Sequence, residues 1–162
     1  MPTAEFTTQV PAPLADVWAW HEDVEAALPS LTPPGKQARL VSAEPLPPRV
    51  GTVVTLEVKV PILGWKKWIA RYTEHEPPTE HEDREAWFTD HQDEGPFKTW
   101  DHTHHMAANP DGTTTLTDRI TYTPPLGPLG KLGDLLIIRR DLRQMFAHRH
   151  KVTREYFATT GI

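Results

Sequence analysis

Residues 98–122 read KTWDHTHHMAANPDGTTTLTDRITY, and this stretch decides the fold that we expect. Asn-Pro-Asp-Gly separates two runs in which apolar and polar side chains alternate, a pattern typical of a β-hairpin. A turn at Pro110–Gly112 would place His104 opposite Asp118 and Met106 opposite Leu116. Because side chains alternate across a strand, the sequence predicts a His–Asp pair on the apolar face of a sheet. The same face would also carry Trp100, His102, Ile120 and Tyr122.

The rest of the chain predicts further strands before this hairpin and a long helix after it. Strand patterns cover 5–10, 37–43, 52–60, 65–76 and 84–92, and a helical pattern begins at Pro13. From about 132 to 157, apolar residues recur every three or four positions, as on one face of an amphipathic helix. This order indicates an α+β fold, with one or two short helices after the first strand and a seven-stranded antiparallel sheet. A twisted sheet wrapped around the last helix leaves a space between them, where a ligand would lie.

Composition limits the classes of protein to be considered. The 162 residues favour one domain over residues 1–162, and the six Trp and five Phe supply apolar area for its core. The absence of cysteine excludes disulfides, thiolate catalysis and Cys-based metal sites. No leader-like segment or long apolar run is found, so a cytoplasmic location is expected.

Charge is distributed unevenly along the chain. Of the net charge of −5, residues 131–162 contribute +4 and the remaining residues −9. A basic helix can contact nucleic acid or anionic lipid. We favour the simpler interpretation that it docks on an acidic body with its charges solvated. Nucleic acid is therefore not an expected partner, and membrane contact is a less favoured alternative.

One end of the predicted sheet is apolar. In an antiparallel meander, alternate turns lie at the same end. The turns after the third, fifth and seventh strands would together display Leu63, Trp65, Phe97, Leu126 and Leu129. Such apolar surface usually marks a ligand mouth or a contact site. The alternative is that these side chains fold inward and close the end of the sheet.

Arg149 projects to the middle of the apolar face of the final helix. A buried guanidinium needs a charged partner, and Asp90 and Asp118 lie on strand faces that we expect to point inward. Two interpretations stay open: a polar recognition patch at the floor of a cavity, or a salt-bridge network that fixes the helix on the sheet. The patch would consist of Asp90, Gln92, His102, His104, Asp118 and Arg149.

The His104–Asp118 pair is also the candidate for chemistry, since a carboxylate can orient an imidazole as a general base. His102 and His104 with Asp118 could bind a divalent ion, but a His–Asp hydrogen bond explains the same residues, so no metal or cofactor is expected. No Gly-x-Ser-x-Gly or phosphate-binding glycine motif is found. His105 should face solvent, and the same is expected of His75, His81, His91, His148 and His150.

Several sequence strings resemble the START-related, helix-grip superfamily known as SRPBCC, which includes polyketide cyclases and Bet v 1-like proteins. The strings are FTDHQDEGPFKTWDHTHHM, TLTDRITYTPPLGPLG and the segment with Phe146, His148 and Arg149. They match Phe-x-Asp-x-Gln, Gly-Pro-Phe, Trp-x-His-x-His and Asp-x-x-x-Tyr of a bacterial ligand-binding branch. Met106 stands where this branch has Phe, which affects the expected cavity shape. The resemblance implies a seven-stranded sheet around the C-terminal helix and an internal cavity for hydrophobic molecules, but no single activity.

The leading hypothesis is therefore a binding module for a small, largely hydrophobic molecule such as a lipid, polyketide or aromatic compound. Its apolar body would contact Trp100, Met106, Ile120, Tyr122 and Leu142, and its polar end the patch around Arg149. One alternative is a cyclase or dehydratase that uses His104 and Asp118 as acid and base. Another is a module that binds a partner or a membrane surface through the apolar end. The sequence predicts no oligomeric state.

Overall fold

The structure is a computed structural model that describes residues 1–60, 64–124 and 137–160. Seven strands form one antiparallel sheet in the order β1-β7-β6-β5-β4-β3-β2. They are β1 (Thr3–Val10), β2 (Ala38–Glu44), β3 (Val53–Val60), β4 (Gly64–Glu76), β5 (Glu85–Glu94), β6 (Thr99–Ala108) and β7 (Thr114–Thr123). The helices are α1 (Leu14–Glu22), α2 (Val24–Leu31), the short 3₁₀ helix η1 (Pro78–His81) and α4 (Arg139–Thr160).

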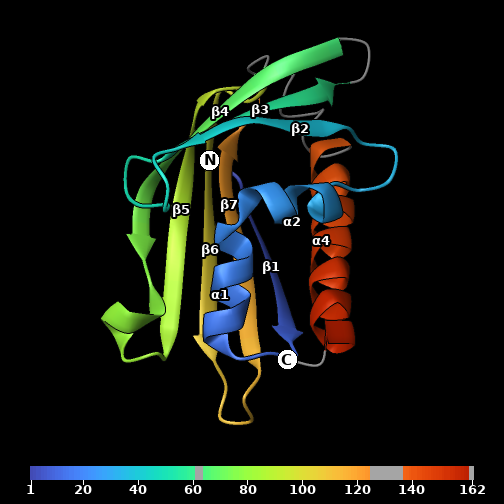
Figure 1. The fold of residues 1–162 in the computed structure, drawn as a ribbon. Coiled ribbons are helices and arrows are strands. Elements are labelled where there is room, and N and C mark those ends of the chain that lie inside the picture. Colours follow the sequence, from blue (N-terminus) through green and yellow to red (C-terminus); the bar gives the residue numbers. More distant parts are fainter. Residues whose placement is uncertain (61–63, 125–136, 161–162) are drawn as a thin grey trace.

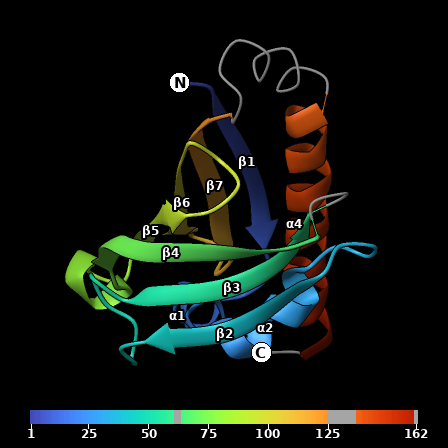
Figure 2. The same ribbon diagram turned by 90° about the horizontal axis from the view of Figure 1, so that it is seen from above.

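The sheet is strongly curved (Figures 1 and 2). Strands β2–β4 run across α4 in Figure 2, whereas β1 lies beside it. Helix α4 contacts β1 and α2, and α2 contacts β2, so the helices connect the two edge strands of the sheet. The α+β fold with a seven-stranded antiparallel sheet and a long C-terminal helix is thus confirmed. The predicted helical residues 132–136 lie outside the described residues.

Two short helices follow the first strand, as the sequence predicts. Asp23 separates them: its backbone is not helical, and its side chain accepts a hydrogen bond from the Ala26 N–H at 3.0 Å. This contact caps α2, because the first N–H groups of a helix lack partners within the helix. The chain therefore turns between α1 and α2 instead of continuing as one helix (Figure 1).

The register of the β6–β7 hairpin is the predicted one. His104 pairs with Asp118, and Met106 with Leu116. At the turn, Gly112 has a φ of 82°, a conformation that favours glycine. Its N–H donates to the Asn109 carbonyl at 3.0 Å. The turn chemistry and the alternation of side chains therefore specify the same register.

The buried apolar residues form two clusters with a polar group between them. One cluster includes Trp18, Phe88 and Met106, and the other includes Trp100 and Phe146. Along β6, the inner face runs from Trp100 through His102 and His104 to Met106, so two histidines separate the clusters. Fully burying a large apolar side chain stabilises the fold by about 1.5–3 kcal/mol. The two clusters can therefore hold the polar group between them in place.

The buried face of α4 differs from the predicted one. Its buried residues are Leu142, Phe146, His150, Thr153 and Phe157. Tyr156, which continues the three- or four-residue spacing of apolar residues and was therefore expected on the buried face, is 42% exposed and packs against Trp20 with ring centroids 5.4 Å apart. The prediction that His150 lies on the surface is wrong, because only 6% of this residue is exposed. Two of the five buried positions are polar, and a pattern of apolar residues alone does not detect them.

Candidate functional site

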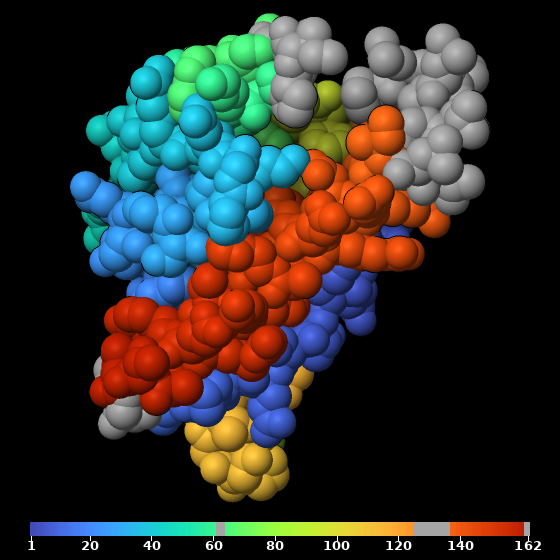
Figure 3. All heavy atoms as spheres, turned by 90° about the vertical axis from the view of Figure 1, so that its right-hand side faces the viewer, coloured from blue at the N-terminus to red at the C-terminus, as the bar shows by residue number. Residues whose placement is uncertain are grey.

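A cavity of about 470 Å³ lies between the inner face of the sheet, α2 and α4. Its wall is mostly apolar, with side chains from all three, among them Leu28, Leu31, Val54, Leu56, Val58, Trp68, Ala70, Phe88 and Met145. Figure 3 shows the face of the molecule on which α2 and the residues after it lie against α4. Lys36 and Asp141 also line the cavity and join these segments through an ion pair of 2.7 Å.

The cavity is lined by some of the predicted ligand-binding residues and not by others. Those that line it are Asp90, Trp100, His102, His104, Leu142 and Arg149, and Phe97, predicted at the mouth, lines it as well. Met106, Asp118, Ile120 and Tyr122 are buried without lining it, and they support the residues that do. Trp65, predicted at the mouth, lies 42% exposed, with the Arg39 guanidinium 4.6 Å from its ring, and does not line the cavity. The other predicted mouth residues, Leu63, Leu126 and Leu129, lie outside the described residues.

Gln92 holds the turn between β5 and β6. Its Nε2 donates to the Phe97 carbonyl at 2.8 Å, and its Oε1 accepts from the Phe97 N–H at 3.4 Å. A Cβ atom on Gly95 would lie 2.3 Å from the Gln92 side chain, so this turn needs glycine. Gln92, predicted to bind ligand, thus positions Phe97 in the cavity wall and does not itself line the cavity.

Asp118 is surrounded by three histidines from two elements. Its Oδ1 accepts from His102 Nε2 at 2.9 Å, and its Oδ2 accepts from His150 Nε2 at 2.7 Å. His104 Nδ1 lies 3.0 Å from Oδ1 but is not aligned for a hydrogen bond. Burial opposes the charge of this carboxylate, but the three imidazoles hold its pKa well below the ordinary value. Asp118 is therefore an anion that links α4 to the hairpin.

The buried imidazoles differ in basicity. Burial and the neighbouring His104 lower the pKa of His102. Burial acts on His104 as well, but the Asp118 and Asp90 carboxylates outweigh it and raise the pKa of His104. Burial lowers the pKa of His21 to about 4, and its Nδ1 lies 2.7 Å from the Val17 carbonyl. A positive charge in this group is therefore favoured on His104 rather than on His102 or His21.

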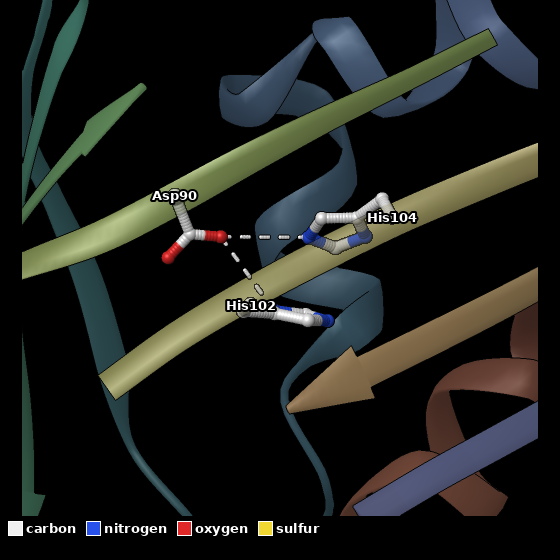
Figure 4. A group of neighbouring side chains, drawn as sticks. All are labelled: Asp90, His102 and His104. Carbon is white, nitrogen blue, oxygen red and sulfur yellow. Dashed lines mark ion pairs between the residues drawn. The ribbon is translucent and has the colours of Figure 1, made fainter. Parts of the chain in front are cut away.

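Asp90 lies opposite His102 on the neighbouring strand β5. Its Oδ2 is 3.5 Å from His102 Nδ1 and 3.6 Å from His104 Nε2 (Figure 4). The two imidazole rings are 3.8 Å apart between centroids. These three side chains are the group, among the described residues, whose ligand atoms are close enough to hold a metal ion. The predicted metal alternative used Asp118 as the carboxylate, but its oxygens are occupied by the histidines.

Arg149 lines the cavity without a direct ion pair to a carboxylate in the described part of the chain. Its Nε is buried and has no hydrogen-bond partner among the described residues. Burial lowers the pKa of Arg149, while Asp118 and Asp90 raise it from a distance. The prediction of a direct partner is thus wrong, and the guanidinium interacts with Asp118 and Asp90 only from a distance. Its carbon lies 5.4 Å from the centre of the Phe146 ring.

Three buried titratable residues of the site were not found by sequence reasoning. His21 and Tyr72 line the cavity, and His150 binds Asp118 behind it. Burial and the neighbouring Asp90 and Glu22 charges raise the pKa of Tyr72. A spacing of four residues from Leu142 to Phe146 and again to His150 was the available signal for His150. Tyr72 shares a face of β4 with Trp68 and Ala70, but the apolar Ile69 between those two obscures the alternation in the sequence.

Comparisons with known proteins agree with this architecture. Residues 10–150 match the family described as polyketide cyclase / dehydrase and lipid transport, so the chain belongs to that family. No curated protein is similar enough in sequence to count as a relative. No helix among the described residues is long and apolar enough to cross a membrane.

Solved structures with low sequence identity share the fold. TTHA0849 from Thermus thermophilus has a TM-score of 0.68 at 15% identity, covering 94% of this chain and 97% of its own. Norcoclaurine synthase from Thalictrum, a point mutant with a transition-state analogue, has a TM-score of 0.62 at 19% identity, covering 96% and 95%. The di-domain aromatase/cyclase BexL has a TM-score of 0.64 at 19% identity, covering 96% of this chain and 46% of its own. The fold is the helix-grip fold of Bet v 1-like proteins.

Proposed function

We propose that this protein binds a small, largely apolar molecule in the cavity between the sheet, α2 and α4. The observation that carries the proposal is a cavity of about 470 Å³ whose wall is mostly apolar but includes Asp90, His104 and Arg149. Ligand pockets commonly occupy about 300–1,000 Å³ and combine apolar walls with a few polar groups. The family, which includes lipid-transport proteins, supports the same class of ligand.

The polar residues indicate which part of the molecule would be recognised. Arg149 lines the cavity without an ion pair in the described part of the chain, and a buried polar group without a partner costs about 1–3 kcal/mol. A carbonyl, hydroxyl or carboxylate oxygen of the ligand would remove this cost. The aromatic rings of Trp68, Phe97 and Trp100 pack on one another beside the cavity and suit a flat apolar body.

A screen of matched compounds tests this proposal. Aromatic and aliphatic molecules with and without one oxygen-containing group would be titrated by calorimetry into wild type, Arg149→Met and Arg154→Met. Arg154, on the same helix, binds Thr8 at 2.7 Å and does not line the cavity. We expect wild type and Arg154→Met to prefer the oxygenated compounds, and Arg149→Met to lose that preference. Equal affinity of all three proteins for every compound would contradict a polar end at Arg149.

A cyclase or dehydratase is the second candidate function. One observation favours it: His104 lines the cavity between two carboxylates that raise its pKa, as a general acid or base requires. Asp118 would orient His104 without touching the substrate. Turnover of a polyketide-like aromatic substrate by wild type, and its loss in a folded His104→Ala variant, would support this function. Undiminished turnover by that variant would remove it.

The apolar end of the sheet is the basis of a third, less favoured role in binding a partner or a membrane surface. Val60, Pro96, Phe97 and Ile137 lie there beside the cavity. Association with liposomes, or a mass that rises with protein concentration, would support it. A single domain over residues 1–162 and a cytoplasmic location stay predictions.

A further inference from the structure

We propose that Asp90, His102 and His104 form a binding site for a divalent transition-metal ion. The ligand atoms would be Asp90 Oδ2, His102 Nδ1 and His104 Nε2. One ligand atom of each residue lies within 4.8 Å of the others, and Figure 4 shows Asp90 of β5 facing both imidazoles of β6. The proposal goes beyond the binding of an apolar molecule and does not depend on it.

The distances from Asp90 to the two imidazoles are those of ligands around an ion. Asp90 Oδ2 lies 3.5 Å from His102 Nδ1 and 3.6 Å from His104 Nε2, longer than ordinary hydrogen bonds. Metal–nitrogen and metal–oxygen bonds of about 2.0–2.2 Å at a tetrahedral angle separate two ligand atoms by about 3.3–3.6 Å. An ion would therefore fit between these atoms with small movements of the side chains.

Asp118 lies on the opposite side of both imidazoles and orients His102 by a hydrogen bond. His102 Nε2 bonds to Asp118 Oδ1 at 2.9 Å, which leaves Nδ1 directed toward Asp90. His104 places Nδ1 3.0 Å from Asp118 Oδ1, without the alignment of a hydrogen bond, and Nε2 toward Asp90. His150 holds the other Asp118 oxygen at 2.7 Å and limits rotation of the carboxylate. Histidine ligands of metals are commonly held in this way, with the second nitrogen bonded to a carboxylate.

The surroundings define the kind of ion and its accessibility. Two imidazoles and one carboxylate suit Zn²⁺, Fe²⁺, Co²⁺ or Ni²⁺ rather than Mg²⁺ or Ca²⁺. All three ligands line the cavity whereas Asp118 does not, so the remaining coordination positions would face the cavity. The carboxylates of Asp90 and Asp118 balance a charge of +2. The positive charge of Arg149 repels the ion, but it would also attract an anionic group of a bound molecule.

Titration of the metal-free protein with Co²⁺ and Zn²⁺ alone tests the site. The variants are Asp90→Asn and His104→Gln, and the control is His105→Gln, the next residue on the outer face of β6, 3.2 Å from Glu85. We expect one equivalent of ion in wild type and in His105→Gln, with a visible Co²⁺ spectrum typical of low coordination number. The two site variants should lose affinity at least about tenfold, and Asp118→Asn should lose about 10–100-fold.

Two results would overturn the proposal: no stoichiometric binding of either ion by wild type, or equal binding by wild type and Asp90→Asn. Circular dichroism would establish that each variant is folded, and Asp90→Asn keeps the size of the side chain if His104→Gln fails to fold. Because no organic molecule is present in the titration, its outcome is separate from that of the proposed ligand binding.

Discussion

The histidines on the two faces of the β5–β6 pair differ in their surroundings although they come from the same stretch of sequence. On the outer face, His91 lies 2.7 Å from Asp101 and His105 lies 3.2 Å from Glu85, and each imidazole is 39% exposed. On the inner face, the side chains of His102 and His104 are 5% and 14% exposed around Asp118. Water screens the ion pairs on the outer face. On the inner face, water is excluded, so the buried side chains determine one another's protonation states. The residue type and the pair of strands are the same on both faces, so burial makes the difference.

The largest expected difference between the faces follows from removing the central carboxylate. Asp118→Asn leaves three buried imidazoles without their anion, and breaking a buried charge pair costs about 3–5 kcal/mol. Asp101→Asn on the outer face should cost about 0–1 kcal/mol. Urea unfolding of both variants measures the two effects. Similar losses of unfolding free energy would show that the inner group is no more demanding than a surface pair.

Acid should destabilise the inner face first. His21 has a pKa of about 4 in the folded protein against an ordinary 6.5, so the unfolded chain binds more protons between these values. Stability should therefore fall as the pH falls from 6.5 to 4, by roughly 3 kcal/mol from His21 alone, with His102 acting in the same direction. His104, with its raised pKa, acts in the opposite direction, and the contribution of Asp118 is lost only below its ordinary pKa.

Unfolding at a series of pH values, for wild type and His21→Phe, measures this dependence. The variant should show a smaller loss between pH 6.5 and 4, because it has no imidazole to protonate on unfolding. If the free energy of unfolding falls equally with pH in both proteins, His21 is not the cause of this loss.

A smaller effect is expected from removing the Gln92 side chain, which holds the turn between β5 and β6. Gln92→Ala leaves the Phe97 N–H and carbonyl without the partners that they have at 3.4 and 2.8 Å, a loss of about 1–3 kcal/mol. Ligand affinity should fall too, because Phe97 lines the cavity. Asp93→Ala, in the same strand but paired with the exposed Arg71, is the control. If the free energy of unfolding and the ligand affinity of Gln92→Ala equal those of wild type, the turn does not depend on the Gln92 side chain.

The smallest effect is expected at His105. His105→Gln removes an imidazole that is 39% exposed beside Glu85, so its free energy of unfolding should change by less than about 1 kcal/mol. Chemical denaturation measures it. A loss as large as that of Asp118→Asn would remove the distinction between the two faces.

The sequence was sufficient to predict the sheet and the register of the hairpin, because the alternation of side chains and the turn residues indicate the same pairing there. Alternation along β6 and β7 and the turn residues around Gly112 select one register, and this register pairs His104 with Asp118. It was not sufficient for the complete Asp118 group, since His150 comes from a helix 32 residues later in the chain. The rotation of helix α4 about its axis depends on its packing against β1 and α2. A polar side chain within a buried helix face gives no signal in an apolar pattern.

The position of Trp65 shows a second limit of the sequence. Along β4, Trp68, Ala70 and Tyr72 line the cavity, and Trp65 lies outside it. Alternation from Trp68, Ala70 and Tyr72 puts Trp65 on the opposite face of the strand, but the prediction counted Trp65 with the apolar turn before it. Strand β4 already begins at Gly64, and Trp65 pairs with Lys59 of β3, so the boundary between turn and strand was what the sequence did not define.

Native mass spectrometry of the protein purified from its own host tests the central claim most directly, with Val58→Trp and Val41→Trp measured beside it. Val58 lines the cavity, whereas Val41 is 58% exposed and does not. We predict that a small apolar molecule accompanies wild type and Val41→Trp in stoichiometric amount and is absent from Val58→Trp. The claim would be contradicted if the same molecule accompanied folded Val58→Trp in equal amount, or if wild type were empty and its melting temperature did not change with any compound of the screen.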